Sequence, residues 1–316
     1  MRVFVAGASG AIGTRLVPQL IERGHEVVGT HRSPQKADHL QALGAEPVAV
    51  DLLDAKAVRR AVLEAGPDAI AHEATALANV LDLTDFDRSF AETNRLRTEG
   101  TDVLLEAARQ AGVERFVAQS YASARYVREG GMVKTEEDPL DRELPPTMSE
   151  SFAAMRYLDQ AVTDAGGVAL RYGAFYGADN DGLVEPVRNQ AYPIVGDGAG
   201  VTSFIHLEDA ARATVLALES NRSGIYNIVD DEPAPAYEWL PVLAEVLGAE
   251  PPQRVTRRQA REYAGEAVAF MATESRGASN EKAKRELGWT LRYPSWREGF
   301  AAAYGSVPVG AGKRAE

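Results

Sequence analysis

The chain of 316 residues contains no cysteine. It therefore forms no disulfide and offers no thiolate nucleophile or cysteine-ligated zinc site. Basic residues are also outnumbered by acidic ones. The chain has 34 lysines and arginines and 46 aspartates and glutamates, which gives a net charge of −12. An acidic chain of this kind has no electrostatic footprint for nucleic acid. We therefore expect neither a nucleic-acid partner nor an anionic membrane surface as a partner.

Long hydrophobic runs are missing as well, although 45% of the residues are hydrophobic. No run approaches the roughly 20 apolar residues that a membrane-spanning helix needs. The composition is that of an ordinary globular protein, so we expect a cytoplasmic protein that acts on a small molecule. No group of histidines and acids has the spacing of metal ligands, and we expect no metal site.

The most informative stretch is an apolar run near the start that leads into three glycines, Gly7, Gly10 and Gly13. A helical pattern follows, and strand, glycine turn and helix in this order are typical of a dinucleotide-binding site. In such a turn the first glycine bends the chain, the second lets backbone approach a diphosphate, and the third allows close helix packing. The amides of Ala11 and Ile12 then face the anion. The alternative is a turn that needs glycine for its geometry alone.

Strand and helix patterns alternate through the first half of the chain. Further strands are expected at 26–30, 47–50, 69–71, 115–118 and 167–171, with helices between them, the longest over about 86–110. This alternation predicts an α/β fold, a doubly wound parallel sheet (Rossmann) with helices on both faces. Ligands of such sheets bind at the carboxyl ends of the strands.

The second half of the chain changes character. Residues 129–150 contain glycines, prolines and many acids without periodicity, which predicts a loop long enough to serve as a lid. A helix is expected after it, over 150–165. We expect a dinucleotide-binding domain over 1–175, to which 201–230 partly returns, a smaller C-terminal substrate domain mainly over 176–304, and a flexible tail over 305–316.

The end of the second expected strand bears on the choice of cofactor. An NAD enzyme usually places an acid there for the ribose 2′-hydroxyl, but this chain has Arg32 and no acid until Asp38. An arginine there can make a forked contact with a 2′-phosphate. NADP is therefore favoured, with NAD possible, and a merely solvated arginine is the alternative.

Several short motifs in order resemble the extended short-chain dehydrogenases/reductases, the superfamily of NAD-dependent sugar epimerases and dehydratases. Besides the three glycines, the matching segments are 100–117, 170–177, 204–209, 224–228 and 284–289. The resemblance implies that Asp51 and Leu52 contact the adenine and that Ala74 and Thr75 lie beside the cofactor, with Ser120 nearby. Asp51 has a simpler alternative role as a turn or capping residue.

The catalytic half of this resemblance is incomplete. In the family a tyrosine acts as acid and base, a lysine four residues later lowers its pKa, and a serine or threonine holds the substrate oxygen. No tyrosine of this chain has a lysine four residues after it. Aligning the 150–165 helix on Asp159 places Ser151 and Met155 at the two positions, while a shift of one residue places Phe152 and Arg156 there.

Three residues are the candidates for proton transfer. Tyr121 follows the fifth expected strand, so its phenol should lie at the mouth of the cofactor site and could protonate a carbonyl. Ser123 is close in sequence to the family's serine position, and Ser151 stands at the tyrosine position, where its hydroxyl would need an activating neighbour. A buried structural role is the alternative for each.

The pattern as a whole predicts an NADP-dependent oxidoreductase that acts on a small organic carbonyl or alcohol. A nucleotide-sugar epimerase or dehydratase is the second interpretation, weakened by the missing tyrosine and lysine, and a non-enzymatic NADP-binding sensor is the third. The family resemblance also implies a homodimer that packs the 86–110 and 150–165 helices together. The apolar stripe for that contact would come from Val103, Leu104, Ala107, Met155, Leu158 and Val162.

Overall fold

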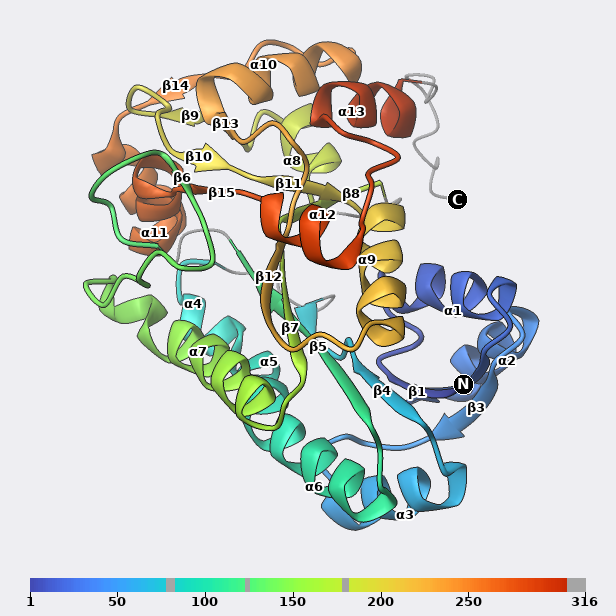
Figure 1. The fold of residues 1–316 in the computed structure, drawn as a ribbon. Helices are drawn as coiled ribbons and strands as arrows, with labels where there is room; N and C mark the ends of the chain where they lie inside the picture. Colours follow the sequence, from blue (N-terminus) through green and yellow to red (C-terminus); the bar gives the residue numbers. More distant parts are fainter. Residues whose placement is uncertain (78–82, 123–125, 178–181, 306–316) are drawn as a thin grey trace.

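The structure is a computed structural model that describes residues 1–77, 83–122, 126–177 and 182–305. Within these residues, seven strands form one parallel sheet in the order β12-β7-β5-β4-β1-β2-β3 (Figure 1). This confirms the predicted doubly wound α/β fold. The strands are β1 (Arg2–Ala6), β2 (Glu26–His31), β3 (Glu46–Ala49), β4 (Ala69–His72), β5 (Arg115–Tyr121), β7 (Val168–Tyr172) and β12 (Gly224–Ile228).

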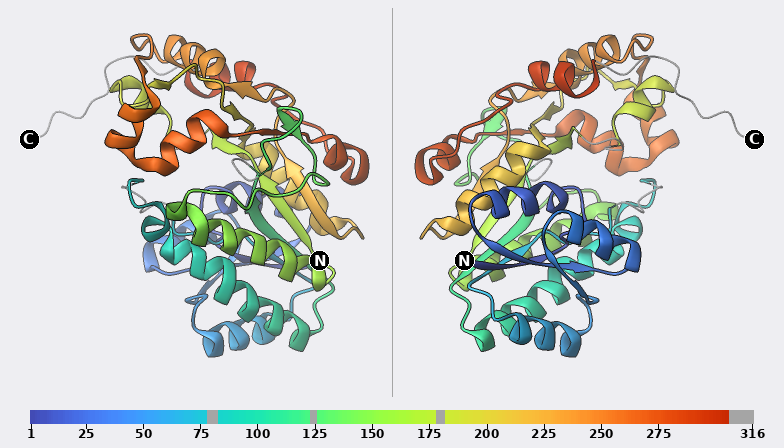
Figure 2. Two further views of the ribbon diagram at one scale, coloured as in Figure 1. Left: turned by 90° about the vertical axis from the view of Figure 1, so that its left-hand side faces the viewer. Right: turned by 90° about the vertical axis from the view of Figure 1, so that its right-hand side faces the viewer.

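Helices cover both faces of the sheet (Figure 2). Residues alternate between the two faces along a strand, so Val3 and Val5 of β1 pack toward one layer of helices, while Phe4 packs toward the other. The first layer contains α1 (Gly13–Glu22), α2 (Pro34–Ala42) and α9 (Leu207–Glu219), and the second contains α3 (Ala55–Ala65), α6 (Thr101–Ala111) and α7 (Ser149–Asp164).

The expected long helix over 86–110 is present from Ala91 to Ala111, but it is interrupted at Phe90 and contains a π-helical turn. The chain forms α4 (Phe86–Ser89), α5 (Ala91–Arg95), a π-helical turn (Leu96–Gly100) and then α6. The Thr98 hydroxyl bonds back to the Asn94 carbonyl at 2.9 Å at the start of the wide turn, as a mid-helix threonine often does where a helix bends. The apolar period alone did not reveal these interruptions.

Apart from these two helix layers, a smaller layer of helices and short strands lies over the carboxyl ends of the sheet strands (Figure 1). Its core is aromatic, with the Phe204 ring 5.1 Å from Trp239 and 5.2 Å from Phe300. The elements of this smaller layer are β8 (Ala174–Tyr176), α8 (Val184–Arg188), β9 (Ile194–Val195), β10 (Val201–Thr202), β11 (Phe204–His206), β13 (Ala234–Pro235), α10 (Ala236–Val246), β14 (Arg254–Val255), α11 (Arg257–Glu274) and α13 (Trp296–Tyr304). Helix α12 (Glu281–Leu287) instead packs on the sheet next to β12. From β11 the chain returns to the sheet through α9 and β12. The expected tail falls outside the described residues beyond 305.

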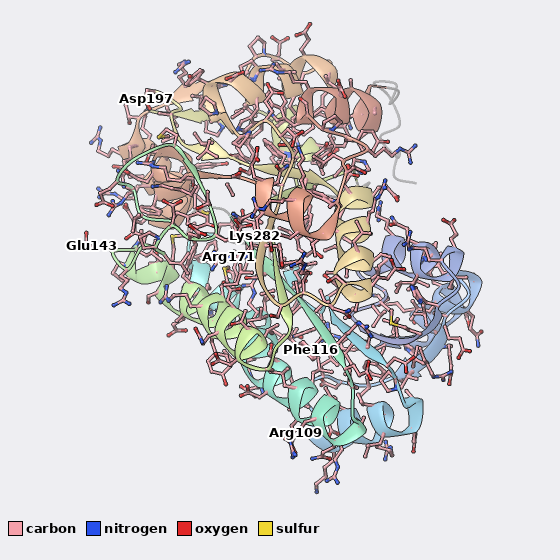
Figure 3. All side chains as sticks on the ribbon, in the orientation of Figure 1. Arg109, Phe116, Glu143, Arg171, Asp197 and Lys282 are labelled. Carbon is pink, nitrogen blue, oxygen red and sulfur yellow. The ribbon has the colours of Figure 1, made fainter. Side chains whose placement is uncertain are left out.

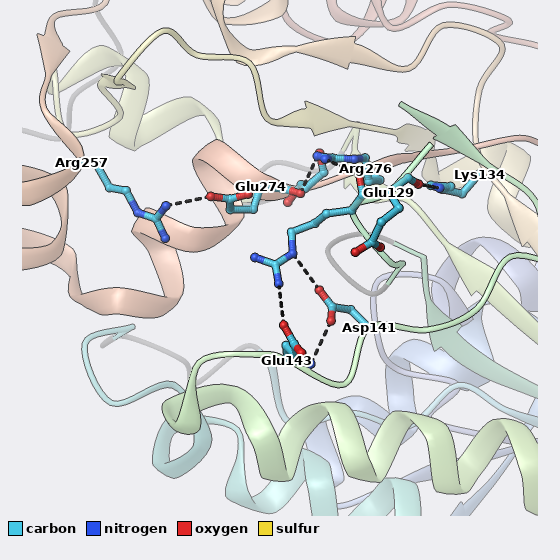
Figure 4. Close-up of polar contacts among 9 residues, drawn as sticks. Glu129, Lys134, Asp141, Glu143, Arg257, Glu274 and Arg276 are labelled. Atoms are coloured by element: carbon cyan, nitrogen blue, oxygen red, sulfur yellow. Dashed lines mark hydrogen bonds and ion pairs between the residues drawn. The ribbon is translucent and has the colours of Figure 1, made fainter. Parts of the chain in front are cut away.

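The predicted loop over 129–150 is mostly irregular but is fastened to the smaller layer. Its β6 (Val133–Lys134) pairs with β15 (Gly277–Ala278), and a short 3-10 turn (Pro146–Met148) leads into α7. Arg128 binds Asp141 at 3.1 Å, and the Arg276 guanidinium donates to the Arg128 carbonyl at 2.8 Å (Figure 4). The loop is therefore a strap between the two layers.

Candidate functional site

The glycine turn is built by close backbone contacts. Gly7 has φ +88°, and a Cβ on it would lie 2.7 Å from the Ala74 backbone. A Cβ on Gly13 would lie 2.4 Å from the Ala8 carbonyl oxygen. The Gly7 amide donates to the Thr30 hydroxyl at 2.9 Å, which fixes the turn against β2. Both glycines are therefore required by packing, at the junction where the sequence places them.

Gly10 differs from the other two glycines. A Cβ there would meet only the Gly7 carbonyl oxygen, at 3.2 Å, and otherwise point into open space. Helix α1 starts immediately beyond it, and its N-cap residue, Ile12, makes no side-chain capping hydrogen bond. Amides at an uncapped helix start form a site for an anion. The turn therefore fits a diphosphate above Gly10, with Ala11 and Ile12 at the helix start.

Arg32, Asp51 and Leu52 are the residues predicted to contact the adenosine part of the cofactor. Arg32 lies at the end of β2 with 57% of its side chain exposed, and it forms an ion pair of 2.6 Å with Glu92. Asp51 accepts the Leu53 amide at 3.0 Å, which is the turn role considered above. Leu52 is buried. A contact of Asp51 or Leu52 with adenine stays a prediction.

The segment after β4 packs directly on the glycine turn. The Glu73 amide donates to the Ala6 carbonyl at 2.8 Å, and Ala74 contacts Gly7 as described. Ala74 and Thr75 are both partly exposed at this edge. This position beside the turn fits the predicted cofactor contact of Ala74 and Thr75, which no bound ligand tests.

Sequence reasoning missed the most unusual group of this edge, the Glu73 carboxyl. Glu73 is 4% exposed, and its Oε1 lies 3.3 Å from the Tyr172 hydroxyl and 3.5 Å from the Thr214 hydroxyl. Burial raises the pKa of the Glu73 carboxyl to about 8, although the two hydroxyls oppose that shift. The signal in the sequence was an acid that closely follows the apolar residues 69–71, where a buried side chain is expected.

Of the predicted catalytic residues, the structure describes Tyr121 and Ser151, which belong to different elements. Residues alternate along β5, so Tyr121 points to the face that carries its register partner Tyr172, whereas Ser120 points to the α7 face with Arg171. Ser120 is buried and Tyr121 is partly buried. Ser123 lies outside the described residues. Tyr121 and the α7 serine, Ser151, therefore lie on opposite faces of the sheet.

The buried Ser151 is held in a partly buried hydrogen-bond network at the start of α7. Its hydroxyl donates to Asp87 at 2.6 Å and accepts from the Asn94 amide at 2.9 Å. The Asp87 carboxylate also accepts the backbone amides of Glu150 and Ser151, so it caps the helix. Met155, at the lysine position, is 2% exposed. This contact set gives Ser151 a structural role, and its catalytic role stays a prediction.

Asp159, the acid used to align α7, is buried in an ion pair with Arg171 of 2.8 Å. Arg171 also donates to the Tyr126 hydroxyl at 3.1 Å, and Tyr126 donates to the Asn227 side-chain oxygen at 2.7 Å. Figure 3 shows Arg171 near the middle of the molecule, between α7 and the smaller layer. Because a buried charge is costly without its partner, this network fixes α7 to β7 and β12.

The histidines offer no metal site in the described part of the chain, where no three metal-binding side chains gather. Burial lowers the pKa of His72 to about 4, and its Nε2 faces the Leu96 carbonyl at 3.2 Å. Burial also lowers the pKa of His206 to about 4, and its Nδ1 accepts the Glu208 amide at the start of α9. Both act as neutral structural residues.

The chain has a glycine turn at the first strand–helix junction of a doubly wound sheet, and the smaller layer lies above the carboxyl edge of that sheet. These features define a nucleotide-dependent enzyme of the extended short-chain dehydrogenase/reductase class. Comparison with known proteins agrees. The chain belongs to the NAD dependent epimerase/dehydratase family, whose model matches residues 3–229.

The relatives include both reductases and epimerases. The chain is 42% identical to a 3-diazoavenalumate denitrifying reductase from Streptomyces sp, over 95% of this chain and 99% of that protein. It is 31% identical to a 2-alkyl-3-oxoalkanoate reductase from Stenotrophomonas maltophilia, over 79% and 76%. Among solved structures, the UDP-glucose 4-epimerase of Thermus thermophilus in complex with NAD has a TM-score of 0.74 at 27% identity, over 97% of this chain and 100% of that one.

These findings confirm the family resemblance and make the chain an enzyme of the NAD(P)-dependent oxidoreductase and epimerase type. The third interpretation from the sequence, a non-enzymatic sensor, is therefore wrong. A nicotinamide dinucleotide is the cofactor that the family uses, and the open space above Gly10 and the uncapped start of α1 fit it.

Proposed function

We propose that this enzyme is an NADPH-dependent reductase of a small organic molecule, and that its substrate carries an arenediazonium group. The observation that carries the proposal is the composition of α7. The two positions that supply a phenol and an ammonium in the family hold Ser151, which is tied to Asp87, and Met155, which is buried. The cofactor turn is intact while the usual proton source is absent from this helix.

A substrate that is already a strong electrophile does not need that proton source. When bound, the reduced dinucleotide supplies a hydride and is oxidised, while the C–N bond of an aryl diazonium ion breaks, a C–H bond forms and N₂ leaves. The balance consumes no proton. The protein then has to bind and orient the substrate and exclude water, which is what a site without an acid can still provide.

In this proposal the amides of the glycine turn, at Gly10, Ala11 and Ile12, hold the diphosphate. Arg32 binds the 2′-phosphate of NADPH, and Asp51 and Leu52 contact the adenine. The contacts along the rest of the cofactor come from Ala74, Thr75 and Ser120. The open space above Gly10 and the exposure of Arg32 support this assignment.

The relatives support the substrate class. The relative at 42% identity is named for the reductive removal of nitrogen from a diazo compound. Reduction of a small carbonyl is the second candidate, because the relative at 31% identity is an oxoalkanoate reductase and Tyr121 ends β5 at the carboxyl edge. Ser123 and Ser151 remain the other candidates for proton transfer in that case. Sugar-nucleotide epimerisation is weaker, since it too needs the acid and base that α7 lacks.

The test is an isotope-tracing assay. The purified enzyme is incubated with an arenediazonium salt or an aryl ketone, in each case with NADPH that carries deuterium on one face of C4 or on the other. UDP-glucose is assayed separately with NAD or NADP in the oxidised form. We expect NADPH oxidation that depends on the diazonium salt, with one deuterium at the ring carbon that lost nitrogen. Turnover of the ketone alone would replace this proposal with the second candidate. A Gly10→Val variant and a reaction without enzyme measure the uncatalysed background.

Assembly and location are separate proposals. Five residues of the expected dimer stripe, namely Leu104, Ala107, Met155, Leu158 and Val162, are buried inside the monomer, so they cannot face a partner. A homodimer through α6 and α7 would have to use their outer face, where Tyr157 is 43% exposed and donates to Asp102. Sedimentation equilibrium of the enzyme and of Tyr157→Glu tests it. None of the described helices is both long and apolar enough to cross a bilayer, and a cytoplasmic location stays a prediction.

A further inference from the structure

The backbone of Glu73 lies directly against the glycine turn, while its carboxyl extends toward Tyr172 of β7 and Thr214 of α9. The backbone of Glu73 is so close to Gly7 that a Cβ on the glycine would lie 2.7 Å from the Glu73 carbonyl carbon. The same residue is hydrogen-bonded to the end of β1 through the Ala6 carbonyl. No side chain or water fits between this backbone and the turn, so a change at Glu73 acts on the place where a diphosphate would bind.

The environment of the carboxyl suits a neutral acid. Its Oε1 is within reach of the hydroxyls of Tyr172 and Thr214, whose own hydroxyls are 2.6 Å apart. Its Oε2 is buried and has no hydrogen-bond partner in the described part of the chain. A carboxylate in this position would leave a buried charge unpaired, which is far more costly than a buried neutral acid.

The charged groups of the surrounding elements do not compensate such a charge. Of the described residues, only Tyr172 and Thr214 influence the pKa of Glu73 besides burial itself. His72 on β4 faces the opposite side of the sheet, toward Leu96, and Arg15 on α1 binds the Gly177 carbonyl. The other titratable or charged residues of the packed elements are Arg2 on β1, Glu22 on α1, Arg115 and Tyr121 on β5, Arg171 on β7, and Glu208, Asp209, Arg212 and Glu219 on α9.

We propose that Glu73 makes dinucleotide binding depend on a proton: the enzyme binds its cofactor while this carboxyl is neutral and loses it when the carboxylate forms. The reason is electrostatic. A carboxylate on the residue whose backbone packs against the turn adds a negative charge to a water-poor interior, where charges are weakly screened, and this charge disfavours a diphosphate at the turn. Glu73 is thus a positioning residue for the cofactor, and the inference rests on the dinucleotide site proposed above.

The test is the pH dependence of cofactor affinity. NADPH and NADH are titrated by fluorescence into the whole enzyme at pH 7, 8 and 9, where both reduced cofactors are stable and the 2′-phosphate is already fully charged. With burial placing the Glu73 pKa at about 8, the wild-type Kd for either cofactor should rise about tenfold between pH 7 and pH 9, as the competent fraction falls. The Kd of Glu73→Gln should stay constant.

Asp230→Asn is the matched control. Asp230 is also a buried carboxyl whose pKa burial raises to about 8, but it follows β12 at the far edge of the sheet from β1. Its removal should leave the rise in Kd unchanged. A rise in Kd that persists in Glu73→Gln, or one that Asp230→Asn abolishes, would overturn the assignment to Glu73.

If Glu73→Gln does not fold, calorimetry of the wild type tests the same coupling between cofactor binding and protonation. Titration of NADH at pH 8.5 in two buffers of different ionisation enthalpy should show the uptake of part of one proton per cofactor bound. Zero uptake together with a flat Kd would overturn this inference and leave the cofactor site intact. Absence of cofactor binding at every pH would overturn both.

Discussion

Arg32, at the end of β2, forms an ion pair of 2.6 Å with Glu92 of α5, which lies 60 residues further along the chain. Both side chains are about half exposed, so the pair contributes little to stability. Its effect is to hold the guanidinium at the strand end with a partner that another anion can replace. The ribose of a bound dinucleotide is expected at this end of the sheet.

Replacing the arginine should separate the two cofactors. In Arg32→Ala the loss of charged hydrogen bonds to a 2′-phosphate should weaken NADPH about 10- to 100-fold, with little change for NADH. Fluorescence titration of both cofactors measures this. Arg109→Ala is the control, because Arg109 is also an exposed, ion-paired arginine but lies at the distant end of α6 (Figure 3). Equal losses for NADPH and NADH would remove the preference for NADP.

The acid of the same pair should have the opposite effect. Glu92→Gln frees the guanidinium and removes a negative charge near the expected 2′-phosphate, so NADPH should bind roughly 2- to 5-fold more tightly, in line with the value of an exposed ion pair. The gain should shrink at high salt because such charges are screened. An unchanged Kd for NADPH at low salt would show that the phosphate does not reach this arginine.

Substitutions at Gly10 and Gly13 should have different effects, the first on cofactor binding and the second on stability. Gly10→Ala should fold with little loss of stability, since its Cβ meets only one oxygen at 3.2 Å, but should weaken cofactor binding at least tenfold by filling the space above the turn. Gly13→Ala should lower the free energy of unfolding by about 1–3 kcal/mol or more, because its Cβ would overlap the Ala8 carbonyl. Urea unfolding and cofactor titration of both variants, with Gly131→Ala as control, check this.

The parts of the fold that could be predicted are those with local signals. The turn at Gly7 to Gly13 is specified by residues within one strand–helix junction. The Asp54 side chain is a second local feature, because it accepts the Lys56 and Ala57 amides directly after it, as an N-cap does. The parallel direction of the strands followed from the alternation of short apolar runs with helical patterns.

The parts that could not be predicted depend on contacts between distant segments. Ser151 looked like a candidate acid because only its helix position was visible, whereas its partner Asp87 lies 64 residues earlier. The burial of Glu73 likewise depends on Tyr172 and Thr214, which are far away in sequence. A single sequence shows which residue types are present, but it does not show which distant residues contact one another in the fold.

The role of Tyr121 should depend on the substrate. If the enzyme reduces a carbonyl, Tyr121→Phe should lower kcat about 100-fold or more, the usual value of a general acid, with no change in the Kd of the cofactor. With an arenediazonium substrate the same variant should keep kcat within about twofold, because that reduction consumes no proton. Parallel steady-state assays on both substrates measure the difference. A large loss on both would mean that Tyr121 positions the substrate and does not donate a proton.

Protonation of the buried Glu73 carboxyl should also make the stability of the protein depend on pH. The pKa of this carboxyl is about 8 in the native state against 4.5 as the ordinary value, so between these limits the folded protein holds a proton that the unfolded chain has lost. The free energy of unfolding then falls as pH rises through this window. Glu73→Gln removes that contribution, so its stability relative to wild type should increase by up to about 2–3 kcal/mol between pH 6 and pH 8. Urea unfolding of both proteins at these two pH values measures it, and a difference that does not change with pH would show that Glu73 is already ionised at pH 6.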